Sequence, residues 1–509
     1  MSVLFTDVHL YDPDLPDGIG PPTDVLVRGD RIAAIGADAR PRHSESGDEP
    51  GRIVAGHGHQ VLLPGLINGH FHSPANHLKG SLPSLPLEEF MLYESPADPA
   101  LAPTPREAYL RTMLAALEML RTGTTSVQDD AFLMPYPEPA IIDAVMSAYA
   151  DCGIRAAVAL DQPEIAEIDK LPFIGRSADP ALRAALSTPP PMDRAGLLDA
   201  YRHLISTWHG AADGRLTAAV SISAPQRVSE RYFGDLDDLS KQHRIPLFAH
   251  MLETKVQRVL AAEQPRFRGR SLVRYTADLG LLSDRMNVIH AVWVDDADLD
   301  LIAEAGAIIA HNPVSNLRLG SGVMPFRRVQ DRGIPTCLGI DEAICDDSAN
   351  LWGVIKMAGL IHNISGQESD TWPAATEVLE CVWSGGAAAM LRRNELGRIQ
   401  AGYLADLILL DLRTAPFTPF NDLPGQLVYC QDGGSVRLTM VAGEVVVENG
   451  HVLTVDQNDL LDEARELFAR RRPAIDKARK DSAGAAGAYQ AMVRRAAATD
   501  VGMNRWVDA

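Results

Sequence analysis

Eight short apolar runs recur along the middle of the chain, between about residues 63 and 400, and amphipathic helical patterns separate them. Strand-like runs that alternate regularly with helices are typical of a parallel α/β sheet. Eight such pairs over roughly 340 residues have the size of a (β/α)8 barrel, so we predict an α/β fold of the TIM-barrel type. The runs lie at 62–72, 124–127, 155–160, 216–221, 246–250, 287–290, 307–311 and 335–340.

The two ends of the chain carry a different pattern. Short β-type runs separated by turns rich in Asp, Pro and Gly occupy the first 62 residues, and similar runs return at 403–411 and 435–447. We expect both ends to close one small β-sandwich. The predicted division is a β-sandwich of residues 1–62 and 401–455, a (β/α)8 barrel of residues 63–400, and a C-terminal helical extension of residues 456–509.

Charge and cysteine content restrict the partners. The formal net charge of -20 and the pI of about 5.2 argue against a nucleic-acid or anionic-membrane partner, which requires a basic face. Five scattered cysteines without a CxxC pair indicate reduced thiols. The first residues lack a signal-peptide pattern, and no run approaches a membrane span. We therefore expect a cytoplasmic protein that acts on a small molecule.

A pair of histidines ends the first apolar run. In a β-strand, residues two apart point to the same side, so His70 and His72 present both imidazoles to one point. The pair alone is equally compatible with two core histidines. A second pair, His57 and His59, is flanked by glycines and predicts a turn instead.

Other predicted strands also end in residues that bind metals or move protons. In a (β/α)8 barrel the catalytic groups lie at the C-terminal ends of the strands, so these side chains are expected to meet at one site. The residues at the five strand ends are His70 with His72, His250, His290, His311 and Asp341.

Four of these residues form a plausible ligand set. His70, His72 and His250 offer nitrogen ligands and Asp341 offers a carboxylate, which suits Zn2+ or another divalent first-row metal with one position left for water. Such an ion makes hydroxide available at neutral pH. Glu253, three residues after His250, is placed to move a proton at the same site. Its alternative role is capping of a following helix.

Several motifs resemble the amidohydrolase superfamily, in the branch of cytosine deaminase-like aminohydrolases and triazine hydrolases. The resemblance extends over residues 1–455 and includes GRIQAGYLADL at 397–407. The motifs nearest the predicted site are PGLINGHFH at 64–72, HMLET at 250–254, VIHAVW at 288–293, HNPVSN at 311–316 and LGID at 338–341.

This resemblance implies a mononuclear centre in which the four predicted ligands hold Zn2+ or, in some members, Fe2+. It also implies that Glu253 and His290 assist proton transfer and orient the water, and that Asp341 accepts a proton from that water. Members of the superfamily commonly form homo-oligomers, so a dimer or tetramer is expected by resemblance alone.

Six residues are candidates for substrate contact. Asn312 and Ser315 match motif positions near the substrate or the last strand, whereas His311 is equally compatible with a structural role. Glu342 replaces the glycine that commonly follows the last ligand, and it either binds an amino-bearing substrate or faces solvent. The remaining two are Gln226, with Arg227 as its alternative, and Trp293, which either stacks on a planar ring or packs internally.

The combined pattern predicts a hydrolase that removes an amino group from a nitrogen heterocycle and releases ammonia. The alternatives are displacement of an alkylamine or halide, opening of a cyclic amide, and a scaffold that lost catalysis. The fourth run, 216–221, holds no lysine that a second metal would need as a bridge. The irregular segment 73–103 follows the first strand and is expected to cover the site.

Overall fold

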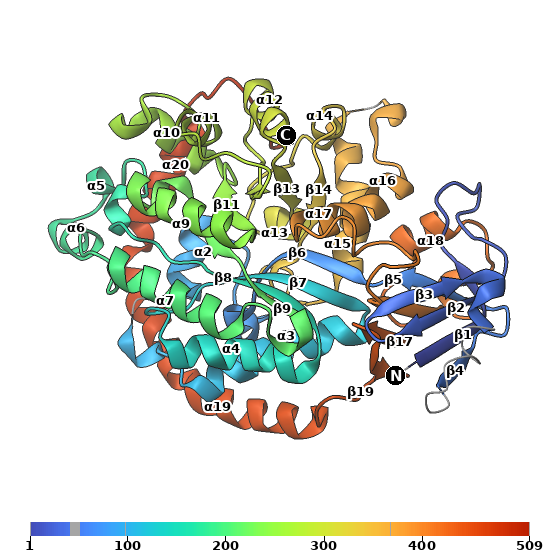
Figure 1. The fold of residues 1–509 in the computed structure, drawn as a ribbon. Helices are drawn as coiled ribbons and strands as arrows, with labels where there is room; N and C mark the ends of the chain where they lie inside the picture. Colours follow the sequence, from blue (N-terminus) through green and yellow to red (C-terminus); the bar gives the residue numbers. More distant parts are fainter. Residues whose placement is uncertain (1, 41–50, 97, 367, 508–509) are drawn as a thin grey trace.

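The computed structural model describes residues 2–40, 51–96, 98–366 and 368–507, and its main body contains two parallel five-stranded sheets (Figure 1). The first sheet has the order β15-β6-β7-β8-β9 and the second β10-β11-β12-β13-β14. The strands are β6 (Leu66–His72), β7 (Thr124–Ala131), β8 (Arg155–Leu160), β9 (Leu216–Ala218), β10 (Val220–Ser221), β11 (Leu247–Met251), β12 (Met286–His290), β13 (Ile308–His311), β14 (Thr336–Leu338) and β15 (Asp341–Glu342).

The two sheets share chain segments at both edges. Only Ala219 separates β9 from β10, and its N–H donates to Val158 O of β8 over 2.8 Å. At the other edge, β14 and β15 lie in one segment, where Ile340 N–H donates to Asn68 Oδ1 of β6 over 3.1 Å. The fourth predicted run is therefore divided between the two sheets, and the eighth run contains β14 and ends just before β15. The first run includes the end of β5 together with β6, while each of the other predicted runs contains one strand.

One strand extends beyond its prediction. The second run was expected at 124–127, but β7 continues to Ala131. The additional residues include three buried polar ones, Gln128, Asp129 and Asp130. Gln128 donates to Gly69 O over 3.0 Å, and the two aspartates that follow accept hydrogen bonds from buried hydroxyls. An apolar pattern does not detect a strand whose buried polar groups are satisfied by distant partners.

Helices follow the strands and cover the outer faces of the two sheets (Figure 1). The predicted capping box at the start of α3 is present, with Thr104 and Glu107 each bonding the other's backbone N–H. The helices are α3 (Pro105–Arg121), α4 (Pro139–Cys152), α7 (Arg194–Trp208), α9 (Glu230–His243), α10 (Lys255–Glu263), α11 (Leu272–Asp278), α12 (Asp296–Ala305), α14 (Phe326–Gln330), α15 (Leu351–Ile361) and α16 (Ala375–Glu380).

The two chain ends meet in a separate, mainly antiparallel nine-stranded sheet. It has the order β19-β18-β17-β16-β5-β1-β2-β3, with β4 paired to β1, and the pairing of β5 with β16 joins the N-terminal and C-terminal parts. The strands are β1 (Ser2–Leu10), β2 (Thr23–Arg28), β3 (Arg31–Ile35), β4 (Arg52–Ala55), β5 (Gln60–Pro64), β16 (Leu407–Asp411), β17 (Val436–Val441), β18 (Glu444–Glu448) and β19 (His451–Val452).

A glycine connects this sheet to the main body. Between β5 and β6 the chain passes through Gly65, where a Cβ atom would lie 2.1 Å from Thr125 Oγ1, so no larger residue fits. A buried ion pair of Arg155 with Asp406, 2.7 Å from Nε to Oδ2, ties the same region to β8. The start of β6, the strand that carries His70 and His72, is thus held in place.

The C-terminal residues form two helices, α19 (Gln457–Ser482) and α20 (Ala486–Ala498), that lie against the main body (Figure 1). Helix α19 contacts α3 and α2 (Leu87–Glu94), and α20 contacts α2, α10 and α5 (Ile174–Ser177). Among the residues that the structure describes, no helix combines the length and apolarity needed to cross a membrane.

Candidate metal centre and active site

Three imidazoles and one carboxylate converge where β6, β11 and β15 end. Nε2 of His70 lies 3.3 Å from Asp341 Oδ1, and Nε2 of His72 lies 3.4 Å from the same oxygen. Nε2 of His250 lies 3.3 Å from Nε2 of His72. All four side chains are buried. The structure therefore brings the four predicted metal ligands to one point.

Backbone carbonyls orient two of the imidazoles. Nδ1–H of His72 donates to Asp130 O over 2.5 Å, and Nδ1–H of His250 donates to Ser223 O over 2.7 Å. This tautomer leaves each Nε2 unprotonated and facing the centre, as a metal ligand requires.

The third imidazole supports the same interpretation. Nε2 of His70 is buried and has no hydrogen-bond partner among the described residues. Burial lowers the pKa of His70 to about 4 despite its contact with Asp341, so the ring is neutral at pH 7. Neutral nitrogen donors together with a carboxylate fit a divalent metal ion.

Asp341 is held from two sides. Ser315 Oγ donates to Asp341 Oδ2 over 2.5 Å. Burial alone would raise the pKa of Asp341, but the close contact with His70 and the neighbouring histidines hold it below its ordinary value. Asp341 and His290 adopt left-handed φ angles of 69° and 72°, an uncommon backbone region that tends to occur at functional sites.

Removal of the Ser315 hydroxyl is expected to weaken metal binding. In Ser315→Ala the Asp341 carboxylate loses the donor that orients it, so we expect the metal dissociation constant to rise about 10- to 100-fold. Competition with a chromogenic chelator measures this constant. The exposed Ser369 provides the control, because Ser369→Ala removes a hydroxyl distant in sequence from the four ligands. Unchanged affinity in Ser315→Ala would contradict this role.

Glu253 and His290 lie beside the ligands. His290 Nε2 is 3.6 Å from Glu253 Oε2 and 3.9 Å from Asp341 Oδ2. Thr254, not Glu253, caps α10, so the capping role considered for Glu253 is taken by its neighbour. Burial, with the negative charges of Asp341 and Glu88, raises the pKa of Glu253 well above its ordinary value. A carboxyl group of this kind can hold a proton near neutral pH.

Two adjoining cavities open onto this centre. The metal-side cavity, of about 430 Å3 counted to its open mouth, is lined by three of the predicted ligands, His72, His250 and Asp341. Glu253, His290 and Arg227 also line it. The second cavity, of about 860 Å3 counted to its open mouth, shares His72, Phe132 and Glu342 with it. Residues of the segment 73–103 line both cavities, and this segment contains the helix α2.

Glu342 lines both cavities. The alternative prediction, that this carboxylate faces solvent, is wrong, since the residue is 8% exposed. Burial raises its pKa well above the ordinary value, and the charge of the adjacent Glu94 raises it further. Burial likewise raises the pKa of Glu94 to about 7. The two carboxyl groups therefore share a proton more readily than they both ionise.

Asn312 and Ser315 contact site side chains and line neither cavity. Asn312 Nδ2 lies 3.2 Å from His290 Nδ1, and the neighbouring Asn316 Oδ1 lies 3.0 Å from the same nitrogen. Ser315 bonds Asp341, as described above. Both residues thus orient groups that face the metal-side cavity.

The other predicted contact residues lie away from the cavities. His311 pairs with His362 over 3.1 Å between their Nε2 atoms. Trp293 donates from Nε1 to Ser321 O over 2.7 Å and packs edge-on against Trp506. Of its two predicted roles, this is the internal packing and not the stacking on a substrate ring. Gln226 is buried and lines neither cavity, and its neighbour Arg227 lines the metal-side cavity instead.

Two buried aspartates behind the ligands were not anticipated. Asp130 Oδ2 lies 3.9 Å from His250 Nδ1, and Asp161 Oδ2 lies 3.9 Å from His72 Nδ1. Asp161 directly follows the predicted run 155–160, so its position at a strand end was a signal, whereas Asp130 lies beyond the end of the predicted run 124–127. Their carboxylates favour the Nδ1-protonated tautomers of both histidines.

Comparisons with known proteins agree with this arrangement. The chain is 30% identical to a 5'-deoxyadenosine deaminase of Methanosarcina mazei over 91% of its own length and 97% of the relative. It is 31% identical to a 5-methylthioadenosine/S-adenosylhomocysteine deaminase of Nitratidesulfovibrio vulgaris, over 87% of this chain and 91% of the relative.

Solved structures have the same fold. An adenosine deaminase from Xanthomonas campestris with bound zinc superposes with a TM-score of 0.78 at 25% identity, covering 92% of this chain and 98% of that one. The atrazine chlorohydrolase from Arthrobacter aurescens complexed with zinc gives a TM-score of 0.79 at 23% identity, covering 91% and 99%. Residues 61–446 match the amidohydrolase family model, and the chain belongs to the amidohydrolase family.

Proposed function

We propose that this protein is a metal-dependent deaminase that replaces the exocyclic amino group of an adenosine-type nucleoside by oxygen and releases ammonia. The observation that carries the proposal is the convergence of His70, His72, His250 and Asp341 at a cavity that Glu253 also lines. Relatives named as deaminases of adenosine-type nucleosides over most of the chain support the substrate class.

Zn2+ is the proposed ion, with Fe2+ as the alternative, because three imidazoles and one carboxylate leave a position for water. When bound, such an ion lowers the pKa of a coordinated water molecule toward neutrality. Asp341 is proposed to accept a proton from that water molecule at its Oδ2 atom. This oxygen lies 3.9 Å from His290 Nε2.

Glu253 is the proposed proton carrier. Hydrolysis of an amino group on a heterocycle requires a proton at the adjacent ring nitrogen and another at the departing amine. The raised pKa of Glu253 allows it to hold a proton that it then transfers at its carboxyl oxygen. His290 Nε2, 3.6 Å from that carboxyl group, is placed to contact the oxygen that replaces the amino group on the ring carbon.

We also propose how the chain is divided. The two parallel sheets are inferred to close into one (β/α)8 barrel of residues 63–400, supported by the segments that they share at both edges. Residues 1–62 and 401–455 are assigned to the small β-sandwich and residues 456–509 to the helical extension. A homo-oligomer, dimer or tetramer, and a cytoplasmic location complete the proposal, the latter supported by free cysteines.

An ammonia-release screen tests the proposed function. Purified protein loaded with Zn2+ is offered 5'-deoxyadenosine, adenosine, cytosine, guanine and an amino-triazine, and ammonia is measured by a coupled assay. We expect release from the adenosine-type nucleosides, together with the absorbance change that accompanies loss of the amine. Ammonia from the triazine alone, or from none of the compounds, would overturn the proposal.

A further inference from the structure

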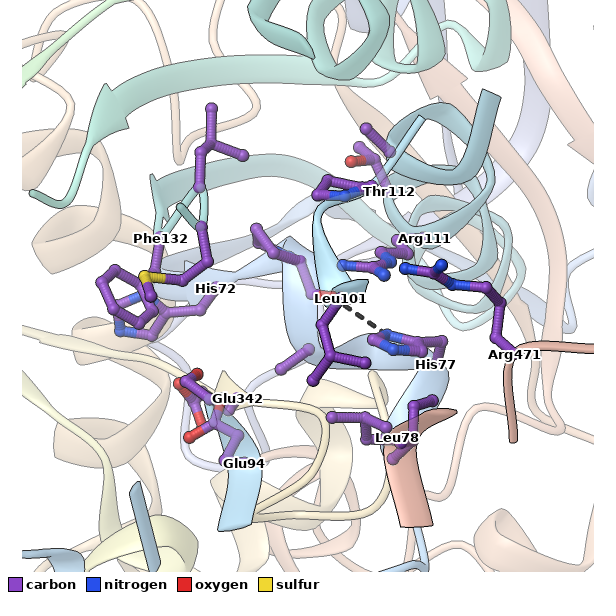
Figure 2. Close-up of a pocket in the computed structure, with 18 of the residues that line it drawn as sticks. His72, His77, Leu78, Glu94, Leu101, Arg111, Thr112, Phe132, Glu342 and Arg471 are labelled. Atoms are coloured by element: carbon purple, nitrogen blue, oxygen red, sulfur yellow. Dashed lines mark hydrogen bonds between the residues drawn. The ribbon is translucent and has the colours of Figure 1, made fainter. Parts of the chain in front are cut away.

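The second cavity has charges of opposite sign at its two ends (Figure 2). Glu94 and Glu342 lie together at the end that adjoins the metal-side cavity. Arg111 of α3 and Arg471 of α19 lie at the other end, next to His77. The metal-side chemistry described above uses none of the three basic residues.

Arg471 is fully engaged by the chain itself. Its Nη1 donates to Ala100 O over 3.0 Å and its Nη2 to Ala102 O over 3.2 Å. Its Nε forms an ion pair with Glu107 Oε1 over 2.8 Å. Glu107 in turn caps α3 through Thr104, so this carboxylate is committed to two structural contacts.

Arg111 lacks such partners. Among the residues that the structure describes, its guanidinium makes no hydrogen bond or ion pair, and its Nε is enclosed without an acceptor. Burial lowers the pKa of Arg111 to about 10; Glu107 offsets this effect in part and Arg471 adds to it. Arg111 therefore remains charged at pH 7. Arg111 is partly buried and lines the cavity, so an anion in the cavity would provide its guanidinium with the partner that the chain does not.

His77 does not supply that anion. Its Nδ1–H donates to Pro74 O over 3.1 Å, and the ring stacks at a tilt on Phe468 of α19. Burial, and then the guanidinium charges around it led by Arg111, hold the pKa of His77 well below its ordinary value. The ring is neutral, and the basic end of the cavity keeps an uncompensated positive charge.

We infer that the second cavity binds an anionic oxygen group, a carboxylate or a phosphate, carried by the substrate on the side remote from the reacting amine, and that Arg111 is its partner. The inference rests on the proposed function, because the heterocycle is taken to lie in the metal-side cavity. A guanidinium binds such oxygens through two parallel hydrogen bonds. The acidic pair of Glu94 and Glu342 disfavours the reverse orientation.

The test compares nucleosides that differ only at the 5' substituent. The Zn2+-loaded protein is assayed with adenosine derivatives that end in a methyl group, a carboxylate or a phosphate at equal chain length. We expect kcat/KM for one of the two anionic compounds to exceed that for the methyl compound at least about tenfold, since paired charges of this kind contribute strongly to affinity. The carboxylate and phosphate arms identify which anion fits.

Substitution of Arg111 gives the decisive comparison. In Arg111→Met and Arg111→Gln we expect the ratio of anionic to neutral kcat/KM to fall about 30-fold, mainly through KM. Arg111→Lys, which keeps the charge without the planar fork, is expected to restore part of the ratio. Arg121→Met, an exposed change on the same helix α3, is the matched control and leaves the ratio unchanged.

The outcomes separate this inference from the proposed function. If the wild-type protein shows no anionic preference, or if the preference survives in all three Arg111 variants, the inference is wrong while deamination stands. If none of the nucleosides is deaminated, the proposed function fails. Calorimetric binding of the carboxylate compound, which needs no turnover, then decides on Arg111: binding that is lost in Arg111→Gln supports the site, and equal binding overturns it.

Discussion

His250→Ala is expected to lose the metal ion and to reduce kcat/KM for deamination on the order of 10^4-fold. A bound divalent ion supplies several kcal/mol of transition-state stabilisation, and each tenfold in rate corresponds to about 1.4 kcal/mol. His250 is the proposed ligand from the second sheet, on β11, and its Nε2 lies 3.3 Å from that of His72. Its loss leaves the other three ligands on β6 and β15, neighbouring strands of one sheet.

The measurement is metal content by plasma mass spectrometry together with kcat/KM on one deaminated nucleoside. His451→Ala, an exposed histidine on β19, is the control and is expected to retain both metal and activity. A His250→Ala protein that keeps its metal and its rate would show that the imidazole is not a ligand. Loss of rate with full metal content would place His250 in substrate binding instead.

The ligand cluster was predictable because it depends on rules that hold locally. The two-residue period of a strand places His70 and His72 on one side, and the shared direction of parallel strands brings His250 and Asp341 to the same end. No contact between distant residues had to be known. The same alternation of strands and helices predicted the parallel strands of the main body, but not the full length of β7, whose last polar residues are bonded by distant partners.

Residues whose role depends on distant packing were not predictable. Trp293 follows His290 closely in sequence, yet its ring packs against Trp506 near the chain end and lines neither cavity. Arg111 lies on α3, and the sequence pattern of α3 did not indicate a cavity. The cavity is completed by Arg471, which belongs to the distant helix α19. These positions depend on how the C-terminal part of the chain packs against the main body, and a local sequence pattern does not predict that packing.

Glu253→Gln is expected to reduce kcat about 10^3-fold while leaving the metal content unchanged. General acid–base catalysis by a positioned carboxyl group typically contributes about 10^2- to 10^4-fold, and an amide of the same shape cannot exchange a proton. Glu253 lies 3.6 Å from His290, and among the described residues it accepts no hydrogen bond from the four proposed ligands, so its replacement should leave those ligands in place. The mutant is therefore expected to differ from His250→Ala in retaining the ion.

The matched control for Glu253 is Glu263→Gln, which removes an exposed carboxylate at the end of α10 and should preserve kcat. Parallel assays of metal content, kcat and KM distinguish the possible roles of Glu253. A fall in kcat at constant KM and full metal content identifies proton transfer, because the interaction then acts only in the transition state. A rise in KM with kcat preserved would instead mean that Glu253 binds the substrate equally before and during the reaction, and its assignment as the proton carrier would be wrong.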